Sequence, residues 1–118
     1  MDKGTYVYCT TQFIGFHQWK DAPDSFAYLR NKHRHVFHVK VVVEVSHVDR
    51  DVEFHYLKVK VDDAIGNQYR KWKEEASCEE MAVDIGSWLR NNPVLGTSFD
   101  VQSVEVSEDG ENGAIVVW

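Results

Sequence analysis

The chain has 118 residues, a length typical of one domain that can bury a core without disulfide or metal staples. Its net charge of −6 and its scattered Lys and Arg argue against a nucleic-acid interface, which needs a basic surface. Its two cysteines form no Cys-x-x-Cys pair, no apolar run reaches the length of a membrane span, and the N-terminal residues form no hydrophobic signal segment. We therefore expect residues 1–118 to be a single cytoplasmic domain without nucleic-acid or membrane partners.

The first part of the chain predicts strands around a short helix. Residues 5–16 are rich in Tyr, Val, Thr and Phe, which favours a strand. A helix over residues 26–30 is expected to follow, with Asp21 or Asp24 as its cap. Residues 33–46 contain six valines and predict a second, longer strand.

The middle of the chain is harder to interpret. Residues 48–51 are polar and predict a hairpin connection, so residues 52–60 are expected to return as a third strand. The apolar alternation changes phase within residues 52–60, as it would at a β-bulge. Residues 62–75 predict a helix despite Gly66.

Residues 77–90 predict a well-defined helix. Ser77 and Glu80 have the spacing of a capping box, in which each side chain bonds the other residue's backbone amide. The helix is expected to stop at residues 91–93, which end in Pro93. Its apolar stripe consists of Met81, Ile85, Trp88 and Leu89.

The last part of the chain predicts a hairpin. Residues 101–107 alternate apolar and polar side chains, and residues 114–118 form a final apolar strand. Residues 108–113 lie between them, where Gly110 and Gly113 can both adopt positive φ. The order of elements predicts an α+β fold with antiparallel hairpins.

Histidines form the first candidate site. His33 and His35 are two residues apart on one strand, so their side chains share a face, and His17 ends the preceding strand. If these strands pair, three imidazoles converge as in a catalytic zinc site. The alternative is that they only pack or bond locally, since the chain has six histidines. Surface or packing roles are expected for the others, His38, His47 and His55.

Two carboxylates and a thiol are further candidates. Glu108, before a glycine turn, could accept two parallel hydrogen bonds from a purine or pterin edge, or be an exposed turn residue. Glu79 lies in the first turn of a predicted helix, where the dipole favours negative charge in any case. Cys78 starts that helix, where its pKa could be lowered, or it fills space there; Cys9 is expected in the core.

These residues resemble the 6-pyruvoyl- and 6-carboxy-tetrahydropterin synthase family. Residues 13–17 are similar to its Phe-x-x-x-His strand end, and residues 33–35 to its His-Gly-His motif. Residues 52–58 are similar to its Val-x-Asp-Phe-x-x-Leu-Lys strand, and residues 77–82 resemble its Thr-Ser-Glu-Asn-Leu-Ala helix start. Residues 104–108 resemble its penultimate strand, whose terminal Glu anchors the pterin. The matches run in family order over nearly the whole chain.

The resemblance implies a T-fold, with two antiparallel strand pairs and helices between them. Subunits of such proteins join their strands into an oligomeric β-barrel, with ligand pockets between subunits. The resemblance also implies a zinc ion held by His17, His33 and His35. It places the ligand site at Ser77, Cys78, Glu79 and Glu108.

Departures from the family pattern bear on function. Leu29 stands where the family has its catalytic Cys, no histidine follows His55, and Arg34 replaces the Gly between the ligand histidines. The proton relay of the lyase reaction therefore looks absent. The first interpretation is a homo-oligomer that binds, and could sequester, a purine-, pterin- or nucleotide-derived molecule, as a phage or bacterial protein would, without ordinary synthase turnover.

Two other interpretations remain open. One is a zinc-dependent lyase similar to the synthases, in which Cys78 or Glu79 takes over proton transfer. The other is a structural subunit whose pocket no longer binds anything.

Overall fold

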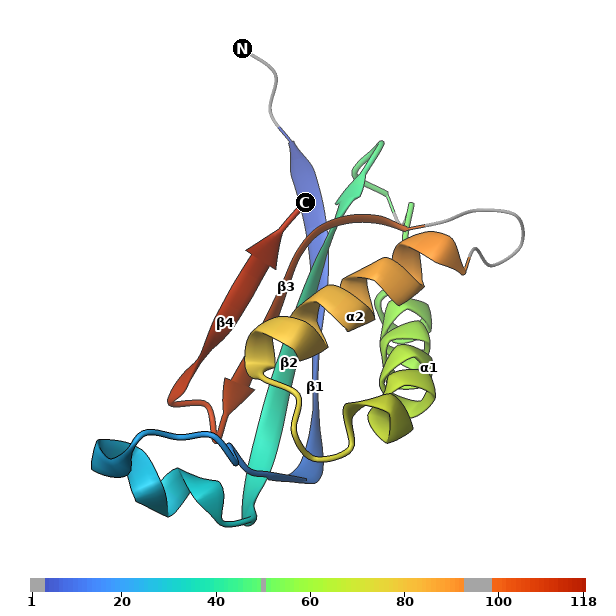
Figure 1. Cartoon of the computed structure of the whole chain (residues 1–118). Coiled ribbons are helices and arrows are strands. Elements are labelled where there is room, and N and C mark those ends of the chain that lie inside the picture. Colours follow the sequence, from blue (N-terminus) through green and yellow to red (C-terminus); the bar gives the residue numbers. More distant parts are fainter. Residues whose placement is uncertain (1–3, 50, 93–98) are drawn as a thin grey trace.

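Four antiparallel strands form one sheet in the order β1-β2-β3-β4, and two α-helices lie between the strand pairs in the sequence. Both helices cover the same face of the sheet (Figure 1). This α+β arrangement is T-fold-like. The strands are β1 (Thr5–His17), β2 (His33–Val45), β3 (Asp100–Glu108) and β4 (Asn112–Val117). The structure, a computed structural model, describes residues 4–49, 51–92 and 99–118.

The pairing of β1 with β2 decides where the histidines lie. The two strands pair without interruption, from Thr5 opposite Val45 to His17 opposite His33. Because side chains alternate between faces, the face that buries Phe37 also carries His35 and His33 at its end. Both strands were predicted within one residue of their observed ends.

The third predicted strand, residues 52–60, is wrong, because residues 54–60 belong to helix α1 (Phe54–Trp72). The Glu53 side chain caps this helix by accepting a hydrogen bond from the Tyr56 amide at 2.9 Å. On the outer face of α1, the exposed side chains of Phe54, Tyr56 and Val59 give this segment the composition of a strand. The buried residues have helical spacing instead: Leu57, Val61, Ala64 and Ile65.

The expected hairpin at residues 48–51 and the bulge after it are therefore also wrong. This segment leads from β2 into α1, and the Asp51 carboxylate accepts a hydrogen bond from the Ser46 amide at 2.7 Å. The observed irregularity of the sheet lies elsewhere, where the register of β2 with β3 shifts between Val42 and Val43. The predicted helix over residues 62–75 is confirmed as part of α1, up to Trp72.

Helix α2 (Cys78–Asn91) confirms the predicted capping box. The Glu80 amide donates to the Ser77 hydroxyl at 3.1 Å, and the Ser77 amide donates to the Glu80 carboxylate at 3.4 Å. The predicted stripe packs inward, with Trp88 only partly buried. Asn91 is still helical, and Pro93, the expected stop, lies outside the described residues.

The short helix after β1 is a 3-10 helix, η1 (Asp24–Arg30), and its predicted capping by Asp21 or Asp24 is wrong. Pro23 holds the cap position, and no side chain bonds the first turn. The Asp24 carboxylate instead accepts a hydrogen bond from Arg30 at 2.8 Å. An ion pair across the helix thus replaces the expected cap.

The turn between β3 and β4 contains two residues with left-handed backbones, Asp109 (φ 57°) and Gly110 (φ 72°). The expectation that Gly113 also has positive φ is wrong, since Gly113 lies within β4. Its lack of a side chain has a different cause. A Cβ at this position would lie 2.1 Å from the Val106 carbonyl oxygen, so the two strands could not approach as they do.

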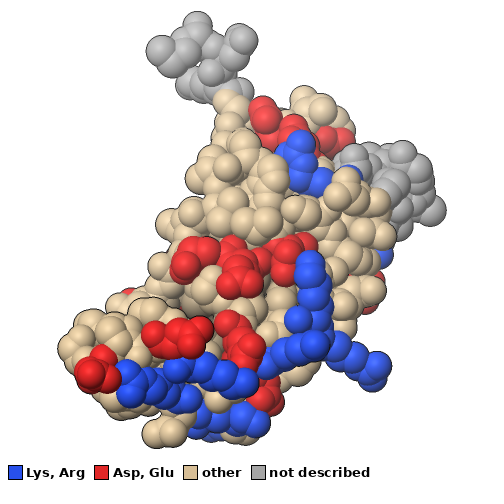
Figure 2. Space-filling model, viewed as in Figure 1, with Lys and Arg blue, Asp and Glu red and all other residues tan. Residues whose placement is uncertain are grey.

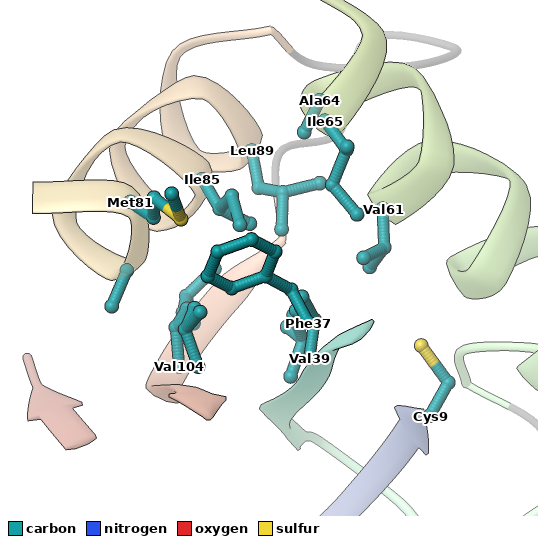
Figure 3. Packing of buried hydrophobic residues seen from close by; sticks show 14 of the residues in the cluster. Cys9, Phe37, Val39, Val61, Ala64, Ile65, Met81, Ile85, Leu89 and Val104 are labelled. Carbon is teal, nitrogen blue, oxygen red and sulfur yellow. The ribbon is translucent and has the colours of Figure 1, made fainter. Parts of the chain in front are cut away.

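The core fills the space between the sheet and the two helices (Figure 3). Phe37 and Val104 from the sheet meet Ile85 and Leu89 from α2, and all four are almost fully buried. Cys9 lies at the edge of this core, as predicted, and burial raises the pKa of its thiol to about 11. None of the described helices combines the length and apolarity that a membrane crossing requires.

We expect the protein to be a homo-oligomer. Strands β1 and β4 are the edges of the sheet, and no described strand pairs with their outer sides. The sheet face away from the helices also exposes apolar side chains, including Tyr8 and Ile115, which are 59% and 63% exposed. Open edges and apolar faces favour association. Sedimentation at micromolar concentration should give a mass above 13.7 kDa, and a clean monomer would contradict the expectation.

Candidate metal centre

Three imidazoles converge at one end of the sheet. His17 ends β1, His33 begins β2 opposite it, and His35 follows on the same face. One nitrogen from each ring can be chosen so that all three lie within 4.8 Å of one another. The cluster predicted from sequence is thus assembled by strand pairing, and it could hold a metal ion.

Hydrogen bonds orient two of the rings. His33 Nδ1 lies 2.8 Å from the Asn31 carbonyl oxygen, and His35 Nδ1 lies 2.7 Å from Asp109 Oδ2. A carbonyl and an ionised carboxylate can only accept, so each Nδ1 donates a hydrogen bond and each Nε2 is left for another partner. This is the state in which histidine binds metals, with an oxygen partner on the other nitrogen.

Asp109 is itself held firmly. Its Oδ1 accepts a hydrogen bond from the Val36 amide at 2.9 Å, and its own amide donates to the Val36 carbonyl at 2.7 Å. The hydrogen bonds that the carboxylate accepts from His35 and from the Val36 amide lower the pKa of Asp109 below its ordinary value. The carboxylate is therefore ionised at neutral pH.

The His17 imidazole is mostly buried at the end of β1. Burial lowers its pKa, Glu108 opposes this, and the neighbouring His33 and His35 lower it further. The ring is therefore neutral at pH 7, the form that binds a metal. His17 Nδ1 and His35 Nε2 are both buried without a hydrogen-bond partner, and a bound cation would satisfy such atoms.

Glu108 lies beside these two nitrogens. It ends β3 on the face that buries Val104 and Val106. Its Oε1 lies 3.4 Å from His17 Nδ1, and its Oε2 lies 3.3 Å from His35 Nε2. These distances allow electrostatic attraction, but neither contact has hydrogen-bond geometry.

A cavity of about 520 Å³ opens next to the histidines. The described residues that line it include Glu75, Glu79, Glu80 and Glu108 but no Lys or Arg. In Figure 2, Asp and Glu side chains form a band across the region of α2, and most Lys and Arg on this face lie below it. The cavity therefore favours cations and N–H donors over anions. Six of its lining residues were singled out from sequence: His17, His33, Ser77, Cys78, Glu79 and Glu108.

Of the two alternatives for Cys78, the structure favours a buried side chain that fills space at the start of α2 over a thiol with a lowered pKa. Burial raises the pKa of the Cys78 thiol to about 12, with Glu108 and Glu79 adding to the shift. A helix start favours a lower thiol pKa, but here burial and the two nearby carboxylates outweigh that effect. The Ser77 hydroxyl takes part in the helix cap, while Glu79 is exposed at the cavity wall.

The structure also places the residues that depart from the family pattern. Leu29 lines the cavity, an apolar side chain where a thiol was expected. Arg34 is exposed and alternates with His33 and His35, so it faces away from them as predicted. The other histidines are exposed and outside the cluster: His38, His47 and His55.

Sequence reasoning did not identify Asp109 or Trp19 as site residues. Trp19 lines the cavity, as Leu29 does. The Trp19 amide donates a hydrogen bond to the Leu29 carbonyl at 2.7 Å, which links these two lining residues. Asp109 follows Glu108 directly, and a carboxylate beside a candidate site residue was the available signal. Its contact with His35 depends on pairing between distant strands.

Comparison with protein-family models and with curated proteins finds no match. Among solved structures, the chain is similar to the crystal structure of the uncharacterized protein WS1659 from Wolinella succinogenes. The two share 14% sequence identity with a TM-score of 0.73, over 98% of this chain and 99% of that one. At this identity the likeness shows the fold alone.

Proposed function

We propose that the protein binds a divalent metal ion, with zinc the first candidate, through His17, His33 and His35. We further propose that it holds a planar nitrogen heterocycle in the adjoining cavity, without ordinary synthase turnover. One observation carries the proposal: three imidazoles, two of them with a buried nitrogen that has no hydrogen-bond partner, converge beside a cavity. Imidazole suits zinc but also iron, nickel and copper, so the ligands are better defined than the metal. The ion would polarise a carbonyl or hydroxyl of a molecule bound beside it.

The cavity walls favour a particular kind of ligand. A volume of about 520 Å³ is within the usual range for small-molecule sites. Glu108 could accept two parallel hydrogen bonds from the adjacent N–H and NH₂ of a guanine or pterin. Trp19, which is 47% exposed, offers an aromatic face for stacking. Because the other charged groups of the wall are acidic, a nucleotide would keep its phosphates outside.

Two features favour binding over the lyase reaction. Leu29 cannot exchange protons where the family has its Cys, and the high pKa of Cys78 keeps its thiol protonated at neutral pH. Proton transfer by a positioned group typically contributes about 10²–10⁴-fold to a rate. We therefore expect the protein to form no product from dihydroneopterin triphosphate at a synthase-like rate.

The ligand prediction is tested by calorimetric titration with guanosine and neopterin. The wild type should bind at least one of them, and Glu108→Gln should bind about tenfold to a hundredfold more weakly. The glutamine side chain would place its NH₂ group against a donor of the ligand, so one hydrogen bond is lost. Hydrogen bonds to charged groups are worth about 1.5–3 kcal/mol. Glu105→Gln is the matched control, since Glu105 pairs with Lys40 and alternates to the other face. Tight binding by Glu108→Gln would place the ligand elsewhere, and robust lyase product would favour the alternative.

A further inference from the structure

We propose that the Glu108 carboxylate is the fourth ligand of the metal ion, so that the site is closed before an organic ligand enters. This inference rests on the metal site proposed above. It assigns Glu108 a role at the metal in addition to its role toward a heterocycle.

The first argument is the arrangement of lone pairs at His35. Its Nδ1 donates to the Asp109 carboxylate at 2.7 Å, so a neutral ring carries a lone pair on Nε2. Glu108 Oε2, which carries negative charge, lies 3.3 Å from that atom. Nε2 is nevertheless buried without a hydrogen-bond partner, so its contact with Glu108 does not satisfy it. A cation between the two atoms would give both of them a partner.

The second argument is distance. Hydrogen bonds between nitrogen and oxygen usually measure about 2.7–3.2 Å. Nitrogen and oxygen atoms bound to one tetrahedral zinc, each about 2.0–2.2 Å from the ion, lie about 3.4 Å apart. Glu108 Oε2 lies 3.3 Å from His35 Nε2, and Oε1 lies 3.4 Å from His17 Nδ1, so each oxygen is at the distance expected between two atoms that bind one ion.

The third argument is how the carboxylate is held. Glu108 is paired with Phe37 in the β2–β3 register, and Asp109 directly after it bonds both backbone groups of Val36. The same Asp109 fixes the His35 ring. One turn therefore sets the positions of two ligands, which is the supporting arrangement that metal sites require.

A closed four-ligand site has a consequence for binding. A heterocycle that takes both oxygens of Glu108 must remove the carboxylate from the metal, which opens a coordination position beside the bound molecule. The metal and the heterocycle would therefore compete for one carboxylate, and each would weaken the other's hold on it.

The test uses Co²⁺ as the metal and no organic ligand. The metal-free protein is titrated with CoCl₂, and its visible spectrum is recorded before and after addition of thiocyanate. We expect the wild type to give an intense four-coordinate spectrum that thiocyanate does not change. Glu108→Gln should bind Co²⁺ at least tenfold more weakly, and thiocyanate should change its spectrum by entering the open position.

Two variants keep the result interpretable. Glu105→Gln makes the same charge change on the other face of β3 and should behave as the wild type. Glu108→Asp keeps the charge but shortens the side chain, so it should also bind more weakly if the carboxylate is a ligand. Wild-type affinity and an unchanged spectrum in Glu108→Gln would overturn the inference. A wild type that binds Co²⁺ no better than His33→Ala would instead overturn the metal site itself.

Discussion

His33→Ala should abolish stoichiometric metal binding while the chain stays folded. The wild type should retain about one ion per chain, because three imidazoles supply most of a zinc coordination sphere. Loss of even a residue that supports a ligand commonly costs about 10–100-fold in affinity, and loss of a ligand should cost at least as much. His33 is the first residue of β2 and only partly buried, so its removal should leave the core intact.

The measurement is metal analysis of protein purified without chelators, combined with thermal unfolding. A chelator should lower the melting temperature of the wild type, because a ligand that binds only the folded state stabilises it. It should leave that of His33→Ala unchanged. His38→Ala is the matched control, since His38 is an exposed histidine of the same strand outside the cluster. Sub-stoichiometric metal in the wild type would argue against the site.

Phe37→Ala should be among the most destabilising single substitutions in the chain. Phe37 is 1% exposed and its ring stacks on Phe13 at a centroid distance of 5.2 Å. Truncation of a buried phenylalanine costs about 3–5 kcal/mol, a large part of the roughly 5–15 kcal/mol that stabilises a typical domain. The ring also contacts His35 and His17, at centroid distances of 5.8 and 6.4 Å, so metal affinity should fall as well.

Urea unfolding of the two proteins gives the difference in the free energy of unfolding. Phe54→Ala is the control, because Phe54 is 58% exposed at the start of α1 and surface substitutions usually change stability by less than about 0.5 kcal/mol. A loss below about 1 kcal/mol in Phe37→Ala would mean that the side chain is not packed as described.

The strands and α2 could be predicted because their signals are local. Valine content marks β2, and the Ser77–Glu80 spacing fixes the start of α2 whatever surrounds it. Residues 52–60 were misassigned because β-branched residues such as Val59 lie on the exposed face of α1, where packing does not select against them. Helical spacing of the buried residues was present but was hidden by that composition.

The candidate site shows the same division. The histidine cluster follows from the spacing of His33 and His35 together with strand pairing, which a sequence can suggest. The pKa of the Cys78 thiol depends on two opposing effects: the helix start lowers it, and burial near Glu108 raises it. Only the assembled structure shows which effect is larger. Asp109 reaches His35 from 74 residues away in the chain, so no local pattern could assign its partner.

The pairing of His17 with His33 also bears on the entropy of the unfolded chain. These residues bound the segment 18–32, which carries Trp19 and Leu29 of the cavity wall. An ion bound to both would act as a reversible cross-link, and closing a loop of about 15 residues removes roughly 3 kcal/mol of chain entropy from the unfolded state. Metal supply would then set part of the free energy of unfolding of the protein.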